Sequence, residues 1–163
     1  MVSSENMGMS DRIIVIVRDK DGNIKQVHDS GWSRNGITYA GFAEIAGLML
    51  TDVGGTPFDY VAIGTGTTAF DPSQTALASE LIRKAGTGTR VTTTVTNDTA
   101  QLVAVFSSGD GLSGTSSITE SGVFNASTGG VMLCRQVFTA VNVNWDAGDT
   151  LQITWKIQVK QAT

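Results

Sequence analysis

The sequence has 163 residues, of which 40% are hydrophobic and 16% are charged, whereas about 25% of the residues of an ordinary soluble domain are charged. This length is typical of one domain with a hydrophobic core. The net charge of −4 argues against nucleic acid as a partner, because a phosphate backbone is bound by basic surfaces. The single cysteine, Cys134, excludes a disulfide within the chain, so we expect stability to come from burial or assembly.

The N-terminus gives no sign of a targeting segment. It lacks the basic start and the apolar stretch of a secretory signal, and no run in the chain approaches the roughly 18 apolar residues of a membrane span. We therefore expect synthesis in the cytoplasm and no membrane partner. Residues 1–11 are polar and aperiodic, which predicts a flexible N-terminal arm in front of one domain over residues 12–163.

The first part of the chain predicts a hairpin and one helix. An apolar, β-branched run at residues 13–17 is typical of a buried strand, and residues 24–28 return as its partner after a turn. Between residues 36 and 50, apolar side chains recur at helical spacing, and Thr38 is a suitable N-cap.

The rest of the chain predicts short strands joined by turns, apart from a second helix that is expected from Asp71, as N-cap, to about Leu81. Hydrophobic alternation and turn residues predict strands at 58–63, at 90–96 paired with 101–106 through Asn97-Asp98, at 118–125 paired with 131–138, and at 151–159. About eight strands with regular turns indicate an all-β fold, a single-domain β-sandwich or jelly roll with one or two short helices and the extended N-terminal arm.

No combination of residues is typical of a catalytic, cofactor or metal site. His28 is the only histidine, which is too few for a His-based metal site, and we expect a solvated side chain beside Asp29. Cys134 lies in an alternating strand and is expected to be a buried apolar residue. The glycine loop at residues 64–68 lacks the Gly-Lys-Ser/Thr ending of a phosphate loop. The sequence therefore predicts a protein that is not an enzyme and takes no cofactor.

The tryptophans divide between core and surface. Trp155 shares one face of the last strand with other apolar residues and is predicted to lie in the core. Trp32 and Trp145 lie beside turn residues and are predicted to contact neighbouring subunits, because aromatic residues are enriched in interfaces.

A family resemblance is carried by the segments Val61-Ala-Ile-Gly-Thr-Gly-Thr-Thr68, Thr75-Ala-Leu-Ala-Ser-Glu-Leu81, Ile118-Thr-Glu-Ser-Gly-Val-Phe-Asn125, Thr128-Gly-Gly-Val-Met-Leu-Cys-Arg135 and Gly148-Asp-Thr-Leu-Gln-Ile-Thr-Trp155. In this order and spacing, residues 60–157 resemble a family of small tailed-bacteriophage virion proteins. Members of that family are described as head decoration (cement) proteins or as tail-fibre-like proteins.

The resemblance implies a subunit on the outer capsid surface of a virion, which binds the major capsid protein and associates with itself, often as a trimer. An N-terminal arm would reach a neighbour, so the candidate capsid or subunit contacts are Ser3, Ser4, Met7, Met9, Trp32 and Trp145. A tail-fibre or collar component that binds tail proteins or host surface glycans is the alternative. A carbohydrate-binding module or a small hydrolase stays open, because a β-sandwich alone does not decide function.

Overall fold

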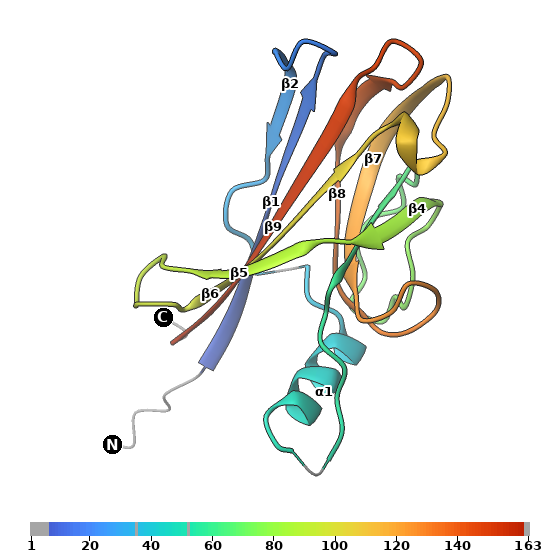
Figure 1. Ribbon diagram of the computed structural model, residues 1–163. Coiled ribbons are helices and arrows are strands. Elements are labelled where there is room, and N and C mark those ends of the chain that lie inside the picture. Colours follow the sequence, from blue (N-terminus) through green and yellow to red (C-terminus); the bar gives the residue numbers. More distant parts are fainter. Residues whose placement is uncertain (1–6, 35, 52, 162–163) are drawn as a thin grey trace.

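The computed structural model describes residues 7–34, 36–51 and 53–161 and shows two antiparallel β-sheets packed face to face (Figure 1). This arrangement confirms the prediction of an all-β sandwich. The elements of these residues are β1 (Met7–Arg18), β2 (Ile24–Asp29), α1 (Tyr39–Leu48), β3 (Tyr60–Gly64), β4 (Glu80–Ala85), β5 (Thr87–Val91), β6 (Thr99–Phe106), the short 3-10 helix η1 (Ser108–Asp110), β7 (Thr115–Phe124), β8 (Met132–Asn144) and β9 (Thr150–Gln161).

The five-stranded sheet has the order β2-β1-β9-β6-β5, and the four-stranded sheet has the order β4-β3-β7-β8. Only Gly86 separates β4 from β5, so one extended stretch of chain forms an edge of both sheets, seen as the light green band in Figure 1. A Cβ atom at Gly86 would lie 2.9 Å from the backbone oxygen of Val103. The glycine therefore lets the chain pass close to β6 where it crosses between the sheets.

The core fills the space between the two sheets because alternate residues of each strand point inward. Trp155 of β9 is completely buried, as its alternating pattern predicts, and its Nε1 donates a hydrogen bond to the Ser121 hydroxyl at 3.0 Å. The other large side chains that are completely buried include Phe106, Ile13, Ile63, Ile118, Leu151 and Ile153.

The first strand is longer than predicted and removes half of the expected arm. β1 begins at Met7 and pairs with β9 from its first residue, where Met7 faces Gln161. Residues 7–11 therefore belong to the sheet, and the prediction of a free arm is wrong for them, while residues 1–6 lie outside the described residues. Polarity concealed this part of the strand, because Asp11 is buried and accepts hydrogen bonds from the Gln136 side chain and from the Gly36 N–H.

The second predicted helix, at residues 71–81, does not form. Asp71 caps only a single turn, and the chain then runs extended into β4. The backbone N–H groups of Ala78 and Ser79 donate to the carboxylate of Glu120, at 3.0 and 2.7 Å, instead of to helical carbonyls. A tertiary acceptor has thus replaced the local hydrogen bonds that the capping pattern indicated.

The predicted strand at residues 90–96 is largely a loop. Its threonine run alternates like a strand, but the Asp98 carboxylate accepts hydrogen bonds from the N–H groups of Thr93, Thr94 and Val95, at 2.9 to 3.0 Å. These bonds curl the segment around Asp98 before β6 begins. The pairing of 118–125 with 131–138 and the strand at 151–159 are confirmed in β7, β8 and β9, each of which extends beyond the predicted range.

Candidate protein-interaction surface

Helix α1 and the chain that returns from it form a small lobe, which we call the helical lobe and define as residues 39–51 and 53–58. Figure 1 shows it projecting from one end of the sandwich, away from the β1–β2 hairpin. The predicted N-cap is confirmed, since the Thr38 hydroxyl accepts a hydrogen bond from the Gly41 N–H at 2.9 Å. The cap starts the helix directly beside strand β8, with which Thr38 is also hydrogen-bonded through its own N–H.

Glycines set how the helical lobe packs. Gly41 is the only buried residue of α1, and a Cβ atom there would lie 2.6 Å from the backbone oxygen of Leu133 in β8. On the other side of the helix, a Cβ atom at Gly47 would overlap the backbone oxygen of Gly54. The helix therefore contacts both β8 and its own return segment through backbone, and most of its apolar side chains are left outside these contacts.

The helical lobe exposes a group of large apolar side chains that are between 41% and 69% accessible to solvent. They are Tyr39, Phe42, Leu48, Met49, Leu50 and Val53. The lobe contains no lysine or arginine. Its acid Glu44 is engaged internally, because Oε1 accepts hydrogen bonds from the Thr56 N–H at 2.7 Å and from the Asn125 amide at 3.0 Å.

An apolar groove of about 500 Å³ opens between the helical lobe and the inner face of the five-stranded sheet. Its floor is formed by the core residues Leu102, Leu133 and Ile157, and Met9 and Leu48 lie on its walls. The sandwich is thus incompletely closed at this end, so that apolar side chains of its core line a surface recess. The groove is the largest apolar recess along the described parts of the chain.

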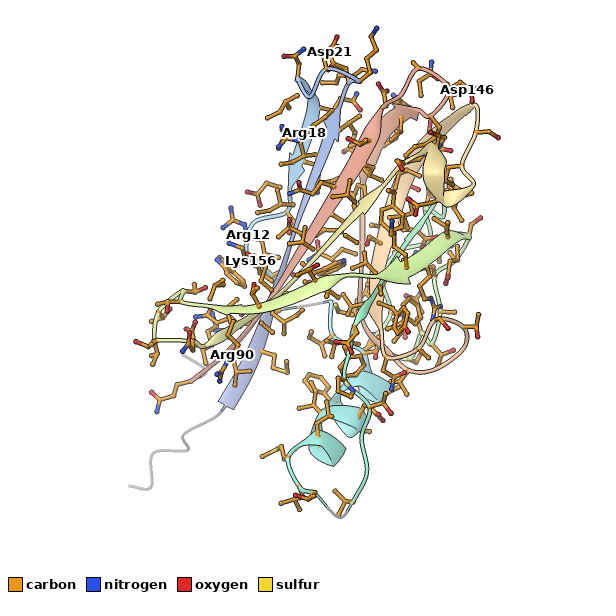
Figure 2. All side chains as sticks on the ribbon, in the orientation of Figure 1. Arg12, Arg18, Asp21, Arg90, Asp146 and Lys156 are labelled. Atoms are coloured by element: carbon orange, nitrogen blue, oxygen red, sulfur yellow. The ribbon has the colours of Figure 1, made fainter. Side chains whose placement is uncertain are left out.

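Charged side chains lie mainly away from the lobe. Figure 2 shows Arg12, Arg18 and Lys156 along the five-stranded sheet, with Asp21 and Asp146 at the far end of the sandwich. Arg12 is paired with Asp29 through an ion pair of 2.5 Å, and the guanidinium holds the pKa of that carboxyl at about 2. The lobe end of the molecule is therefore distinguished from the rest by its lack of charge.

Two charged residues nevertheless lie on the rim of the groove, Arg90 and Asp98. Burial would raise the pKa of Asp98, but the N–H groups of Val95, Thr93 and Thr94 and the Gln158 amide outweigh it and lower this pKa well below its usual range. Since these donors occupy the carboxylate, Asp98 has a structural role in the loop after β5.

The predicted contact residues are not brought together in one place. Met9 lines the groove, and Met7 is paired in β1, whereas Ser3 and Ser4 lie outside the described residues. Trp32 is 37% exposed, and its predicted role stays a prediction.

The structure corrects the prediction for Trp145. This residue is only 1% exposed, it packs in the core, and its Nε1 donates to the Ser116 hydroxyl at 2.8 Å. A turn residue on either side of a tryptophan does not show whether the indole ring points out or in, and here it points in.

A buried ion pair joins the segments that carry the family resemblance, and sequence reasoning missed it. Glu120 and Arg135 are both 0% exposed, and Nε of Arg135 lies 2.8 Å from Oε2 of Glu120. Glu120 also accepts from the N–H groups of Gly66, Ala78 and Ser79 at 2.7 to 3.0 Å. Burial would raise the pKa of Glu120, but these backbone donors and the guanidinium lower it below its usual range.

Arg135 completes this network by donating to the Gln74 side chain at 3.0 Å and to the Thr68 carbonyl at 2.9 Å. Every partner belongs to the same chain and both charged groups are shielded from water, so the pair holds the 66–79 connection against β7 and β8 and faces no substrate. An arginine in an otherwise apolar strand was the available signal in the sequence, because a buried cation needs a buried anion.

His28 and Cys134 also have structural surroundings. The His28 ring stacks on Phe138 with the ring centres 5.1 Å apart, so it is less solvated than predicted, and burial lowers its pKa below the usual value. Cys134 is completely buried, as predicted, and burial raises the pKa of its thiol well above the ordinary range. A buried thiol of high pKa is a poor nucleophile.

Within the described residues, no three His, Cys, Asp or Glu side chains cluster as metal ligands would. The same residues include no helix long and apolar enough to cross a membrane. The chain matches no known protein-family model, no curated protein and no solved structure.

Proposed function

We propose that this chain is a viral structural protein that decorates and stabilises a bacteriophage capsid by binding across major capsid protein subunits. One structural observation carries the part of the proposal that concerns binding, namely the apolar surface of the helical lobe. The resemblance of residues 60–157 to small virion proteins supplies the part that concerns the capsid. In this role the protein acts by contact alone and is not an enzyme.

The composition of the lobe supports a binding role, because a helix that is apolar on all sides is normally buried. Six half-exposed side chains, at ~200 Å² for each fully accessible large residue, expose roughly 650 Å² of mostly apolar surface. The largest patch on a typical monomer is about 300–600 Å², and larger patches mark interaction sites. We infer that the lobe is covered in the assembled state of the protein.

The charge of the lobe favours a protein over a lipid surface as its cover. Helices that lie on membranes carry lysine or arginine on their polar face, which attracts anionic lipids. The helical lobe has neither residue type, and its charged side chains are acids. Interfaces between proteins are instead depleted of charge at their centre.

A binding assay on capsids tests the proposal. Purified protein is mixed with expanded capsids that lack it, the capsids are sedimented, and the bound protein is quantified. We expect saturable binding with a fixed number of copies per capsid and an increased resistance of the capsids to heat. Absence of binding to heads, together with binding to isolated tails, would contradict the proposal and favour the tail-fibre or collar alternative.

A further inference from the structure

The helical lobe and the apolar groove are parts of one surface. Leu48 belongs to both, since it is 41% exposed on the helix and also lines the groove. Met49 and Leu50 follow directly and project from the lobe with 69% and 64% of their surface accessible. The same end of the molecule therefore presents apolar side chains that protrude and an apolar recess that could receive them.

The size of this surface is suited to a stable association. The roughly 650 Å² of the lobe, to which the groove adds further area, is close to the ~800 Å² per partner of a standard interface. A mainly apolar surface of this extent resembles the interfaces of homodimers, which are more apolar than those of transient complexes.

Covering this surface would leave few charged groups without a partner. The Glu44 carboxylate is satisfied by Thr56 and Asn125, and the Asp98 carboxylate by its own loop and Gln158. Burial of an unpaired charge is what usually prevents a surface from closing against an apolar partner. Here the acids described in the lobe and on the loop beside the groove already have donors from the same chain.

We propose that the partner on this surface is a second copy of the same chain, with Met49 and Leu50 of one copy packed in the groove of the other. Each copy carries both the protrusion and the recess, so a single symmetric or cyclic arrangement supplies both halves of the contact at once. This inference deepens the proposed function, on which it rests for its biological setting, by assigning the lobe to contacts between decoration subunits and leaving other surfaces for the capsid.

Sedimentation velocity of the full chain, from low nanomolar to high micromolar concentration, measures the association without any capsid. We expect a concentration-dependent oligomer. Leu50→Asp on the protrusion and Gly88→Glu in the groove should each weaken self-association by about thirtyfold or more, the level of an interface hot spot. Gly88 suits this purpose because a Cβ atom there meets nothing within 4 Å. Val27→Asp, on the exposed edge strand β2 at the far end, is the matched control and should leave the association unchanged.

A cross-linking experiment identifies the contact directly. Leu50→Cys and Gly88→Cys proteins are prepared separately and mixed under oxidising conditions. We expect a disulfide-linked dimer that contains one chain of each kind, and the native Cys134 does not interfere because it is completely buried. The two chains carry different tags, so that this product is told apart from dimers of either variant alone.

The outcomes separate the two proposals. A chain that stays monomeric at every concentration, or an oligomer that Leu50→Asp and Gly88→Glu leave intact, would overturn the self-association. Circular dichroism of each variant shows whether it is folded. Capsid binding is measured independently, and a monomeric protein that still decorates capsids would leave the proposed function standing while removing this inference.

Discussion

Glu120 and Arg135 lie on neighbouring strands of the four-stranded sheet, with the Nε and Oε2 atoms 2.8 Å apart and neither side chain exposed. Through Gly66, Ala78 and Ser79 on one side and Thr68 and Gln74 on the other, the pair anchors the connection between β3 and β4. We conclude that the segments of the family resemblance meet in a network that stabilises the subunit.

Breaking this pair should strongly destabilise the protein. Replacing Arg135 with Met leaves the buried Glu120 carboxylate without its cation, and we expect the free energy of unfolding to fall by about 3–5 kcal/mol. Urea denaturation followed by tryptophan fluorescence measures the loss. The partly exposed pair Arg12–Asp29 is the control, and Arg12→Met should cost less than ~1 kcal/mol. Equal losses in the two variants would contradict the assignment of the buried pair as a structural centre.

The same pair predicts a loss of stability in acid. The folded protein holds the pKa of Glu120 below its ordinary value, which is about 4.3 in an unfolded chain. A lowered carboxyl pKa contributes stability that is complete above the unfolded pKa and is lost as the pH falls through the folded pKa. We therefore expect the difference in unfolding free energy between the native protein and Glu120→Gln to shrink below about pH 4. A difference that is constant between pH 7 and pH 3 would show that Glu120 is not ionised in the fold.

The contact between α1 and β8 depends on the missing side chain at Gly41. A methyl group there would press on the Leu133 backbone, which cannot move aside as a flexible side chain could. We expect Gly41→Ala to destabilise the protein by about 1–3 kcal/mol and to speed hydrogen exchange in the helical lobe. Gly88→Ala, which adds the same group in open space, should change stability by less than ~0.5 kcal/mol. If Gly41→Ala is equally harmless, the lobe is not seated on β8 as described.

Two deletions distinguish the sheet from the part of the arm that precedes it. Deleting residues 1–6 leaves all of β1, and we expect an unchanged melting temperature. Deleting residues 1–11 also removes the part of β1 that pairs with residues 157–161 and the groove residue Met9. This second deletion should lower the melting temperature clearly in a differential scanning calorimetry experiment. Identical melting temperatures for the two truncated proteins would contradict the pairing of residues 7–11 with β9.

Much of the fold could be predicted where local patterns and tertiary contacts agree. The alternation in 151–159 marks β9 because one face of that strand meets the core along its length. The Thr38 cap could be predicted because its hydrogen bond to Gly41 lies within a few residues.

The remaining elements depend on contacts between residues distant in the sequence. Asp71 caps a turn as its sequence suggests, but the helix fails because Glu120, far along the chain, offers the backbone of Ala78 and Ser79 a better acceptor. The partnership of Glu120 with Arg135 is likewise a product of strand pairing, which sequence spacing does not reveal.

The candidate surface was missed for a different reason. The apolar residues between Tyr39 and Val53 were expected to bury a helix in the domain, and helical spacing alone does not show how much of a helix its own domain covers. Only the seating of α1 through Gly41 and Gly47 shows that Phe42, Met49 and Leu50 stay outside. The tryptophan that best fitted an interface by its neighbours, Trp145, proved to be in the core.

The location of the protein on intact virions tests the central claim most directly. Cryo-electron microscopy of particles with and without the protein, followed by a difference map, shows where it binds. We expect regular density over the outer surface of the head, spanning neighbouring major capsid subunits. Density confined to the tail, or no density on the particle, would contradict the account.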